Sequence, residues 1–169
     1  MARRGSRAPS YDELVARMVG IQERLSAARL TVASAESCTG GLLAAVLSEH
    51  GGSSGHYLGG AVVYSNDAKT VFADVPSQLI HGHGAVSSVV AAALARGARD
   101  RLGARVGLGI TGIAGPGGGT ASKPVGLVYV AIESDPLSTV GACRFEFDRA
   151  GNRLASVGAA IDLLERCVA

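Results

Sequence analysis

The side chains that could do chemistry gather in three polar segments of the sequence. Residues 36–41 read ESCTGG, residues 64–69 read YSNDAK, and residues 112–123 are rich in glycine. The first and last follow apolar stretches typical of strands, and ligands of open α/β sheets usually bind beyond the carboxyl ends of strands. We therefore expect the functional site at these segments.

Ser37 is the candidate nucleophile. It lies where an expected strand gives way to a helix, so its hydroxyl could be aimed outward. The backbone N–H groups of residues 38–41 would point the same way, and Gly40 and Gly41 would let a substrate approach closely. These donors could form an oxyanion hole or a phosphate cradle, and both readings stay open. Serine is also a favoured helix cap, so Ser37 could simply cap the next helix.

A serine nucleophile needs a base that takes its proton. The four histidines are His50, His56, His81 and His83. None lies in the three segments, so a Ser-His-Asp triad is poorly supported. Lys69 is the better candidate, because burial lowers the pKa of a lysine and lets the neutral amine act as a base. Tyr64, five residues earlier, could bridge Ser37 and Lys69. Outside a site, Lys69 would lie at the surface and Tyr64 would be half-buried.

The roles of three residues near Ser37 can each be interpreted in two ways. Glu36 could orient the turn, which we favour, or act directly as an acid or base. Cys38 could be a rival nucleophile or, as we favour, a packed thiol lining the site. Thr39 could cap the helix or contact a substrate.

Hydrophobic periodicity, caps and turn residues predict the elements that position these groups. A capping box at Ser10–Glu13 starts the first helix. We expect four helices, over residues 10–29, 42–50, 66–72 and 87–102, with Asn66 capping the third and Ser87 or Ser88 capping the fourth. We also expect a C-terminal helix whose inward face carries Leu154, Val157, Ile161 and Leu164. We expect strands over residues 30–35, 57–64, 105–111, 125–133 and 139–147, the last two forming a hairpin, and loops over 51–55, 76–84 and 112–124.

This alternation predicts an α/β fold, a single-domain layered α/β/α sandwich with a mixed sheet and a C-terminal helix. Hydrophobic residues make up 47% of the 169 residues and charged residues 18%, which is enough for a packed core. We expect residues 1–9 to be a flexible basic tail and residues 10–169 to form the domain.

The composition also limits the binding partners and the cellular compartment that we expect for the protein. The net charge is only +2 and no basic stripe with aromatic residues is present, so we expect no nucleic-acid binding. No apolar run reaches the roughly 18 residues of a membrane span, so we expect no membrane partner. Cys38, Cys143 and Cys167 are odd in number and far apart, which argues against disulfides and zinc and fits a cytoplasmic protein.

The motifs together resemble those of the CinA C-terminal domain family. The matching stretches are AESCTGG at 35–41, YSNDAK at 64–69, GAVS at 84–87, TGIAGPGGGT at 111–120 and KPVG at 123–126. Their order and approximate spacing match as well, and the resemblance covers roughly residue 10 to the C-terminus. Many members carry a further N-terminal domain, for which this chain is too short, so it resembles the stand-alone form.

The resemblance implies an amidohydrolase that converts nicotinamide mononucleotide to nicotinate mononucleotide and ammonia in pyridine nucleotide salvage. It assigns catalytic roles to Ser37, Tyr64 and Lys69, with Ser37 as nucleophile and Lys69 as base. It implies a small nucleotide substrate, no cofactor, no metal and a homo-oligomer. The alternatives are a nucleotide-binding accessory module without turnover and an amidase of another substrate.

A further set of residues is expected to contact the substrate. It comprises Glu36, Cys38, Thr39, Gly40, Gly41, Thr111, Gly112, Gly115, Gly117 and Arg149. Arg149 resembles the family's arginine near the last strand and could pair with the phosphate or orient the site. The family often has GDR where this chain has Phe147-Asp148-Arg149, and a surface ion pair is the other reading of Arg149.

Overall fold

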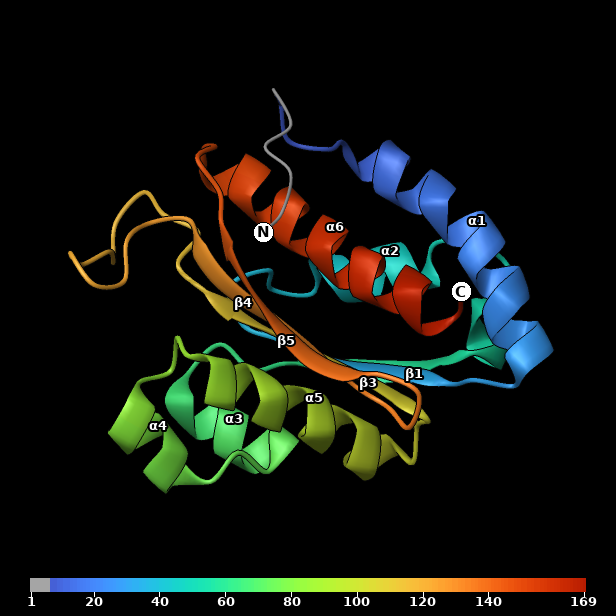
Figure 1. The fold of residues 1–169 in the computed structure, drawn as a ribbon, viewed down its shortest axis with the longest axis horizontal. Helices are drawn as coiled ribbons and strands as arrows, with labels where there is room; N and C mark the ends of the chain where they lie inside the picture. The colour runs from blue at the N-terminus through green and yellow to red at the C-terminus, as the bar shows by residue number, and fades with distance from the viewer. Residues whose placement is uncertain (1–6) are drawn as a thin grey trace.

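The computed structural model describes residues 7–169, which form a five-stranded sheet between two layers of helices (Figure 1). The strands are β1 (Val32–Glu36), β2 (Tyr57–Val62), β3 (Val106–Gly112), β4 (Leu127–Glu133) and β5 (Ser138–Arg144), in the spatial order β2-β1-β3-β4-β5. β1 pairs in parallel with β2 and β3, whereas β4 pairs antiparallel with β3 and β5. The predicted mixed sheet and C-terminal hairpin are confirmed.

Three helices cover each face of the sheet. One layer holds α1 (Tyr11–Ala28), α2 (Leu42–Ser48) and α6 (Arg149–Cys167), and the other holds α3 (Asn66–Ala73), α4 (Ser77–His83) and α5 (Ser88–Leu102) (Figure 1). The capping box at Ser10 and Glu13 starts α1, and Ser87 caps α5, as predicted. The layered α/β/α sandwich is therefore confirmed.

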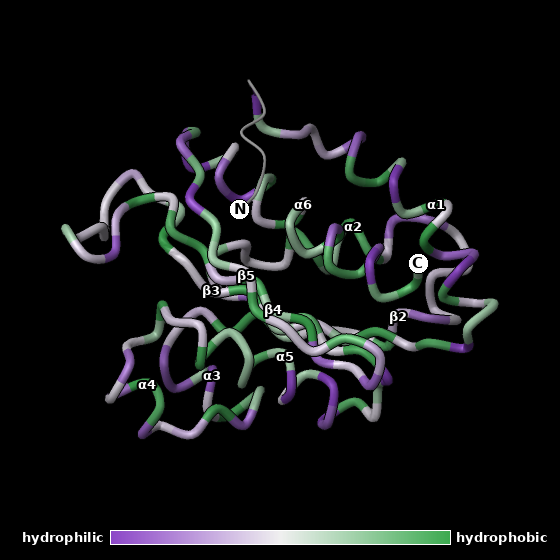
Figure 2. The backbone as a smooth tube through the Cα atoms, viewed as in Figure 1, coloured by the Kyte–Doolittle hydropathy of each residue, from purple (hydrophilic) through white to green (hydrophobic). Residues whose placement is uncertain are grey.

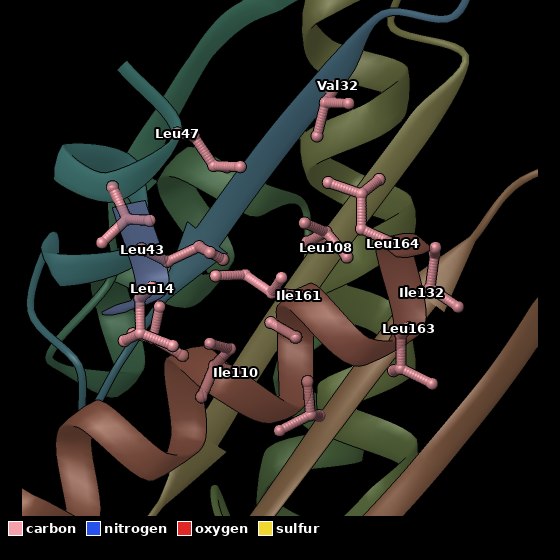
Figure 3. Close-up of a cluster of buried hydrophobic side chains, with 14 of the residues drawn as sticks. Leu14, Val32, Leu43, Leu47, Leu108, Ile110, Ile132, Ile161, Leu163 and Leu164 are labelled. Carbon is pink, nitrogen blue, oxygen red and sulfur yellow. The ribbon is translucent and has the colours of Figure 1, made fainter. Parts of the chain in front are cut away.

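The main core lies between the sheet and the layer of α1, α2 and α6. Every residue of β1 is buried, and Leu108 and Ile110 of β3 meet Ile161 and Leu164 of α6 in one apolar cluster (Figure 3). Hydrophobic residues accordingly dominate the middle of the sheet (Figure 2). On the other face α5 packs very close to β3, where a Cβ at Gly107 would lie 1.9 Å from the Ala95 carbonyl oxygen.

Three local expectations were wrong. The expected loop over residues 76–84 contains α4, which begins after Pro76 and buries Ile80. Ser65, not Asn66, caps α3, because the Ser65 hydroxyl accepts a hydrogen bond from the backbone N–H of Ala68. The expected loop over 51–55 includes a short 3-10 helix, η1 (Ser53–Gly55).

The predicted tail over residues 1–9 lies mostly outside the described residues, which begin at Arg7. Arg7 itself forms an ion pair with Glu13 in the first turn of α1. Within residues 7–169 no helix combines the length and the apolar character that crossing a membrane requires.

Candidate active site

Strands β1, β2 and β3 bring the motif segments to one edge of the sheet. Glu36, the last residue of β1, pairs with Val62 of β2 and with Ile110 of β3. Beyond the strands, Val63 N–H donates to the Glu36 carbonyl at 2.7 Å and Ser37 N–H donates to the Ile110 carbonyl at 2.9 Å. The turn after β1 therefore lies between the segments that follow β2 and β3.

Glu36 organises the turn that connects β1 to α2. Its carboxylate is buried and accepts backbone N–H bonds from Gly41 at 3.2 Å, Leu43 at 3.0 Å and Ala44 at 2.8 Å. These are donors that the start of a helix would otherwise leave unpaired. The contacts agree with the interpretation of Glu36 as an orienting residue.

Ser37 is buried in this turn, with 9% of its area exposed. The N-cap of α2 is Gly41, so the alternative that Ser37 caps this helix is wrong. Within the described part of the chain, no hydrogen bond is formed by the Ser37 hydroxyl. Its oxygen is thus not committed to a structural contact.

The backbone donors of the turn are fewer than expected. Gly40 N–H donates to the Ser37 carbonyl at 3.1 Å, and Gly41 N–H is bound by Glu36. The prediction that these two N–H groups face a substrate is therefore wrong. Gly40 and Gly41 serve the turn through positive φ angles of 58° and 95°, which favour glycine. The N–H groups of Cys38 and Thr39 remain as candidate donors.

Lys69 is the largest fully buried side chain among the described residues, with 2% of its area exposed, so the surface alternative is wrong. Its Nζ donates to the carbonyls of Val63 at 3.0 Å, Tyr64 at 3.3 Å and Ser65 at 3.4 Å. Burial lowers the pKa of Lys69, and the Cys38 thiol would oppose this shift only in its ionised form. The site therefore holds a desolvated amine beside the turn that carries Ser37.

Tyr64 lies in the open part of the site with 60% of its area exposed, so it is not a half-buried strand residue. Its hydroxyl accepts a hydrogen bond from Arg149 Nη2 at 2.9 Å, and Arg149 Nη1 donates to the Gly115 carbonyl at 2.7 Å. Arg149 forms no ion pair with a carboxylate within residues 7–169, so the surface-pair alternative is not supported. A bridge from the Tyr64 phenol to Ser37 and Lys69 stays a prediction.

Cys38 is buried beside Ser37. Burial raises the pKa of its thiol to about 11, against the opposing effects of its own backbone N–H, Arg153 and Arg149. The thiolate is the nucleophilic form, so the thiol is a poor nucleophile near neutral pH. The structure thus favours a packed thiol over a rival nucleophile.

The segment after β3 has structural contacts of its own. The buried Thr111 hydroxyl donates to the Ala85 carbonyl at 2.8 Å, which ties β3 to the GAVS segment. A Cβ at Gly112 would lie 2.6 Å from Val128 Cγ2, whereas Gly117 has open space around it. Contact of Thr111, Gly112, Gly115 and Gly117 with a substrate stays a prediction.

Two residues of α6 that the sequence reasoning missed also build the site. Arg153 Nη2 donates to the Thr39 carbonyl at 2.7 Å, and buried Asn152 donates to the Ala114 carbonyl at 3.0 Å. Arg149 and Arg153 are four residues apart at the start of the expected helix, so they share one face. That spacing was the signal in the sequence.

A cavity of about 540 Å³ opens beside these residues. Pro116 and Phe147 contribute to its apolar lining, and Arg149 and Arg153 also line it. The volume is in the range of pockets for small organic ligands. Within residues 7–169, no three His, Cys, Asp or Glu side chains are grouped so that they could hold a metal ion.

Known proteins are similar to this chain in sequence and in fold. The family model of the CinA C-terminal domain matches residues 16–168. A CinA-like protein of Acidobacterium capsulatum is 52% identical over 136 residues, which are 80% of this chain and 33% of that protein. This chain therefore spans about a third of the length of the curated relatives it matches.

Solved structures of similarly named proteins have the same fold as this chain. The competence/damage inducible protein CihA from Agrobacterium tumefaciens is 40% identical, with a TM-score of 0.85 over 96% of this chain and 99% of that chain. A CinA superfamily protein from Escherichia coli is 30% identical, with a TM-score of 0.88 over 98% of this chain and 94% of that chain.

Proposed function

The chain belongs to the CinA C-terminal domain family, and we propose that it is an amidohydrolase that converts nicotinamide mononucleotide to nicotinate mononucleotide and ammonia. One observation carries the proposal. The desolvated Lys69 amine, with its lowered pKa, lies at the same sheet edge as the uncommitted Ser37 hydroxyl. A nucleophile and a base at one sheet edge are what hydrolysis through an acyl-enzyme requires.

In the proposed reaction, Ser37 Oγ attacks the carboxamide carbon while the neutral Lys69 amine takes the hydroxyl proton. The tetrahedral intermediate collapses, the C–N bond breaks, and Lys69 returns the proton to the departing nitrogen, which leaves as ammonia. Water then attacks the Ser37 ester, with Lys69 again serving as the base. Nicotinate mononucleotide is released and the serine hydroxyl is restored.

The turn supplies donors for the charge that develops on the carbonyl oxygen. Within the described residues, the Cys38 N–H interacts only with its own thiol and the Thr39 N–H has no hydrogen-bond partner, and Glu36 holds the turn through three backbone N–H groups. Donors fixed before the reaction stabilise an oxyanion without reorganisation. We assign the oxyanion hole to these two N–H groups.

The remaining parts of the proposal concern the setting of the reaction. A place in pyridine nucleotide salvage follows from the proposed substrate and product, and we place the enzyme in the cytosol, where its three free cysteines stay reduced. Homo-oligomer formation and contact of Tyr64 with the reacting groups stay predictions.

Ammonia release from nicotinamide mononucleotide by the purified, metal-free protein tests the proposal. We expect ammonia and nicotinate mononucleotide in equal amounts, and no comparable release from free nicotinamide, which lacks the ribose phosphate. Binding of nicotinamide mononucleotide without ammonia release would contradict the proposal and support a nucleotide-binding module. Release from other amides alone would identify an amidase of another substrate.

A further inference from the structure

The cavity beside the site is lined by two cations that no carboxylate neutralises. Arg149 and Arg153 lie four residues apart on α6, and neither forms an ion pair with a carboxylate within residues 7–169. Other arginines of the chain do form such pairs, for example Arg17 with Asp162 and Glu165. An unpaired pair of arginines in a concave site is an electrostatic match for an anionic group.

Arg153 also has hydrogen-bonding capacity that the protein does not use. Its Nη2 donates to the Thr39 carbonyl, but its buried Nε has no partner within the described part of the chain. A buried donor without a partner is unfavourable and is rare in native proteins. A guanidinium has five N–H donors, so a bound oxyanion could satisfy those that remain.

One acidic residue lines the same cavity. Asp148 is the N-cap of α6, and its carboxylate accepts the backbone N–H of Gly151 at 2.8 Å. The carboxylate is thus engaged at the helix start, and two guanidinium charges face one carboxylate. The net charge lining the cavity remains positive.

The cavity adjoins the reacting groups through the same two arginines. Arg153 binds the Thr39 carbonyl two residues after Ser37, and Arg149 binds the hydroxyl of Tyr64. An anion held by both guanidinium groups would lie beside the nucleophile turn.

We propose that Arg153, together with Arg149, binds the phosphate group of the substrate in this cavity, and that Arg153 sets the preference for a phosphorylated over an unphosphorylated nucleoside. This inference rests on the proposed amidase function. Arginine suits the role because its planar fork can donate two parallel hydrogen bonds to a phosphate.

The test compares nicotinamide mononucleotide with nicotinamide riboside, which lacks the phosphate. For Arg153→Ala we expect kcat/KM for the mononucleotide to fall about 10- to 100-fold, the range for losing charged hydrogen bonds. For the riboside, which has no phosphate, we expect a smaller fall that reflects only the lost contact with Thr39, so the ratio of the two kcat/KM values should fall about 10-fold. Arg166→Ala, an exposed arginine in the last turn of the same helix, is the matched control and should change neither.

Two results of this kinetic comparison would overturn the inference. An equal fall for both substrates would mean that Arg153 only holds the turn through Thr39, and an unchanged preference would exclude it from the subsite.

Calorimetric titration of the Ser37→Ala protein with ribose 5-phosphate separates this inference from the proposed function. Binding that Arg153→Ala abolishes, together with no ammonia release by the wild-type protein, would support the phosphate subsite while contradicting the amidase. Absence of ribose 5-phosphate binding, in a protein that does release ammonia, would contradict the subsite alone.

Discussion

At the scale of single residues, the environment of Lys69 decides its chemistry. The side chain is buried, and its amine is surrounded by the carbonyls of the segment that follows β2. A lysine in water is charged at neutral pH and cannot accept a proton, whereas burial disfavours the charged form. Burial therefore supports the proposed role of Lys69 as a base.

The pH dependence of turnover tests this role. The reactive form is the neutral amine, so kcat should rise with pH as Lys69 loses its proton, with a midpoint below the ordinary lysine value of 10.5. Lys69→Met should lower kcat by about 10²- to 10⁴-fold, the usual contribution of a general base, and should remove this rising limb. A wild-type profile without a rising limb, or a Lys69→Met variant with full turnover and native circular dichroism, would argue against Lys69 as the base.

At the scale of elements, the site depends on how β1 joins α2. A buried carboxylate at the end of β1 accepts three N–H groups at the start of the helix, which fixes the turn that carries Ser37. The turn is therefore rigid because of a strand residue and not because of a side-chain cap on the helix, where Gly41 stands.

Replacing that carboxylate should loosen the junction. In Glu36→Gln the amide nitrogen faces backbone donors and cannot accept their hydrogen bonds, so we expect the free energy of unfolding to fall by about 1–3 kcal/mol. Denaturant unfolding measures the change, and Glu23→Gln, at an exposed position of α1, is the control and should stay within about 0.5 kcal/mol. Equal stability of the two variants would show that the three hydrogen bonds contribute little.

Most helices and strands could be predicted from local sequence patterns, whereas contacts between residues far apart in the sequence could not. The capping box at Ser10 and the hairpin of β4 and β5 are encoded by neighbouring residues, and both were correct. Helix α4 was missed because residues between Pro76 and Gly84 look like a loop, while the burial of Ile80 depends on tertiary packing. The engagement of Gly41 N–H by Glu36 was missed because it depends on side-chain geometry that spacing does not define.

At the scale of the whole molecule, the site exists only where distant segments meet. Tyr64 and Arg149 are 85 residues apart in sequence, and Thr39 and Arg153 are 114 apart, yet each pair is hydrogen-bonded. The parallel strands place the turn after β1 beside the segment after β2, and α6 lies across the same sheet (Figure 1). The family resemblance indicated Ser37, Tyr64 and Lys69, but the contact of Arg153 with the Thr39 carbonyl is seen only in the folded structure.

The central claim is that Ser37 is the nucleophile, and its removal tests that claim most directly. We expect Ser37→Ala to lower ammonia release from nicotinamide mononucleotide by about 10³-fold or more, while the protein keeps native circular dichroism. Ser48→Ala, the same change on α2 away from the turn, should leave the rate unchanged. Undiminished turnover by Ser37→Ala would contradict the claim, and loss of turnover in Cys38→Ala alone would move the nucleophile to the neighbouring thiol.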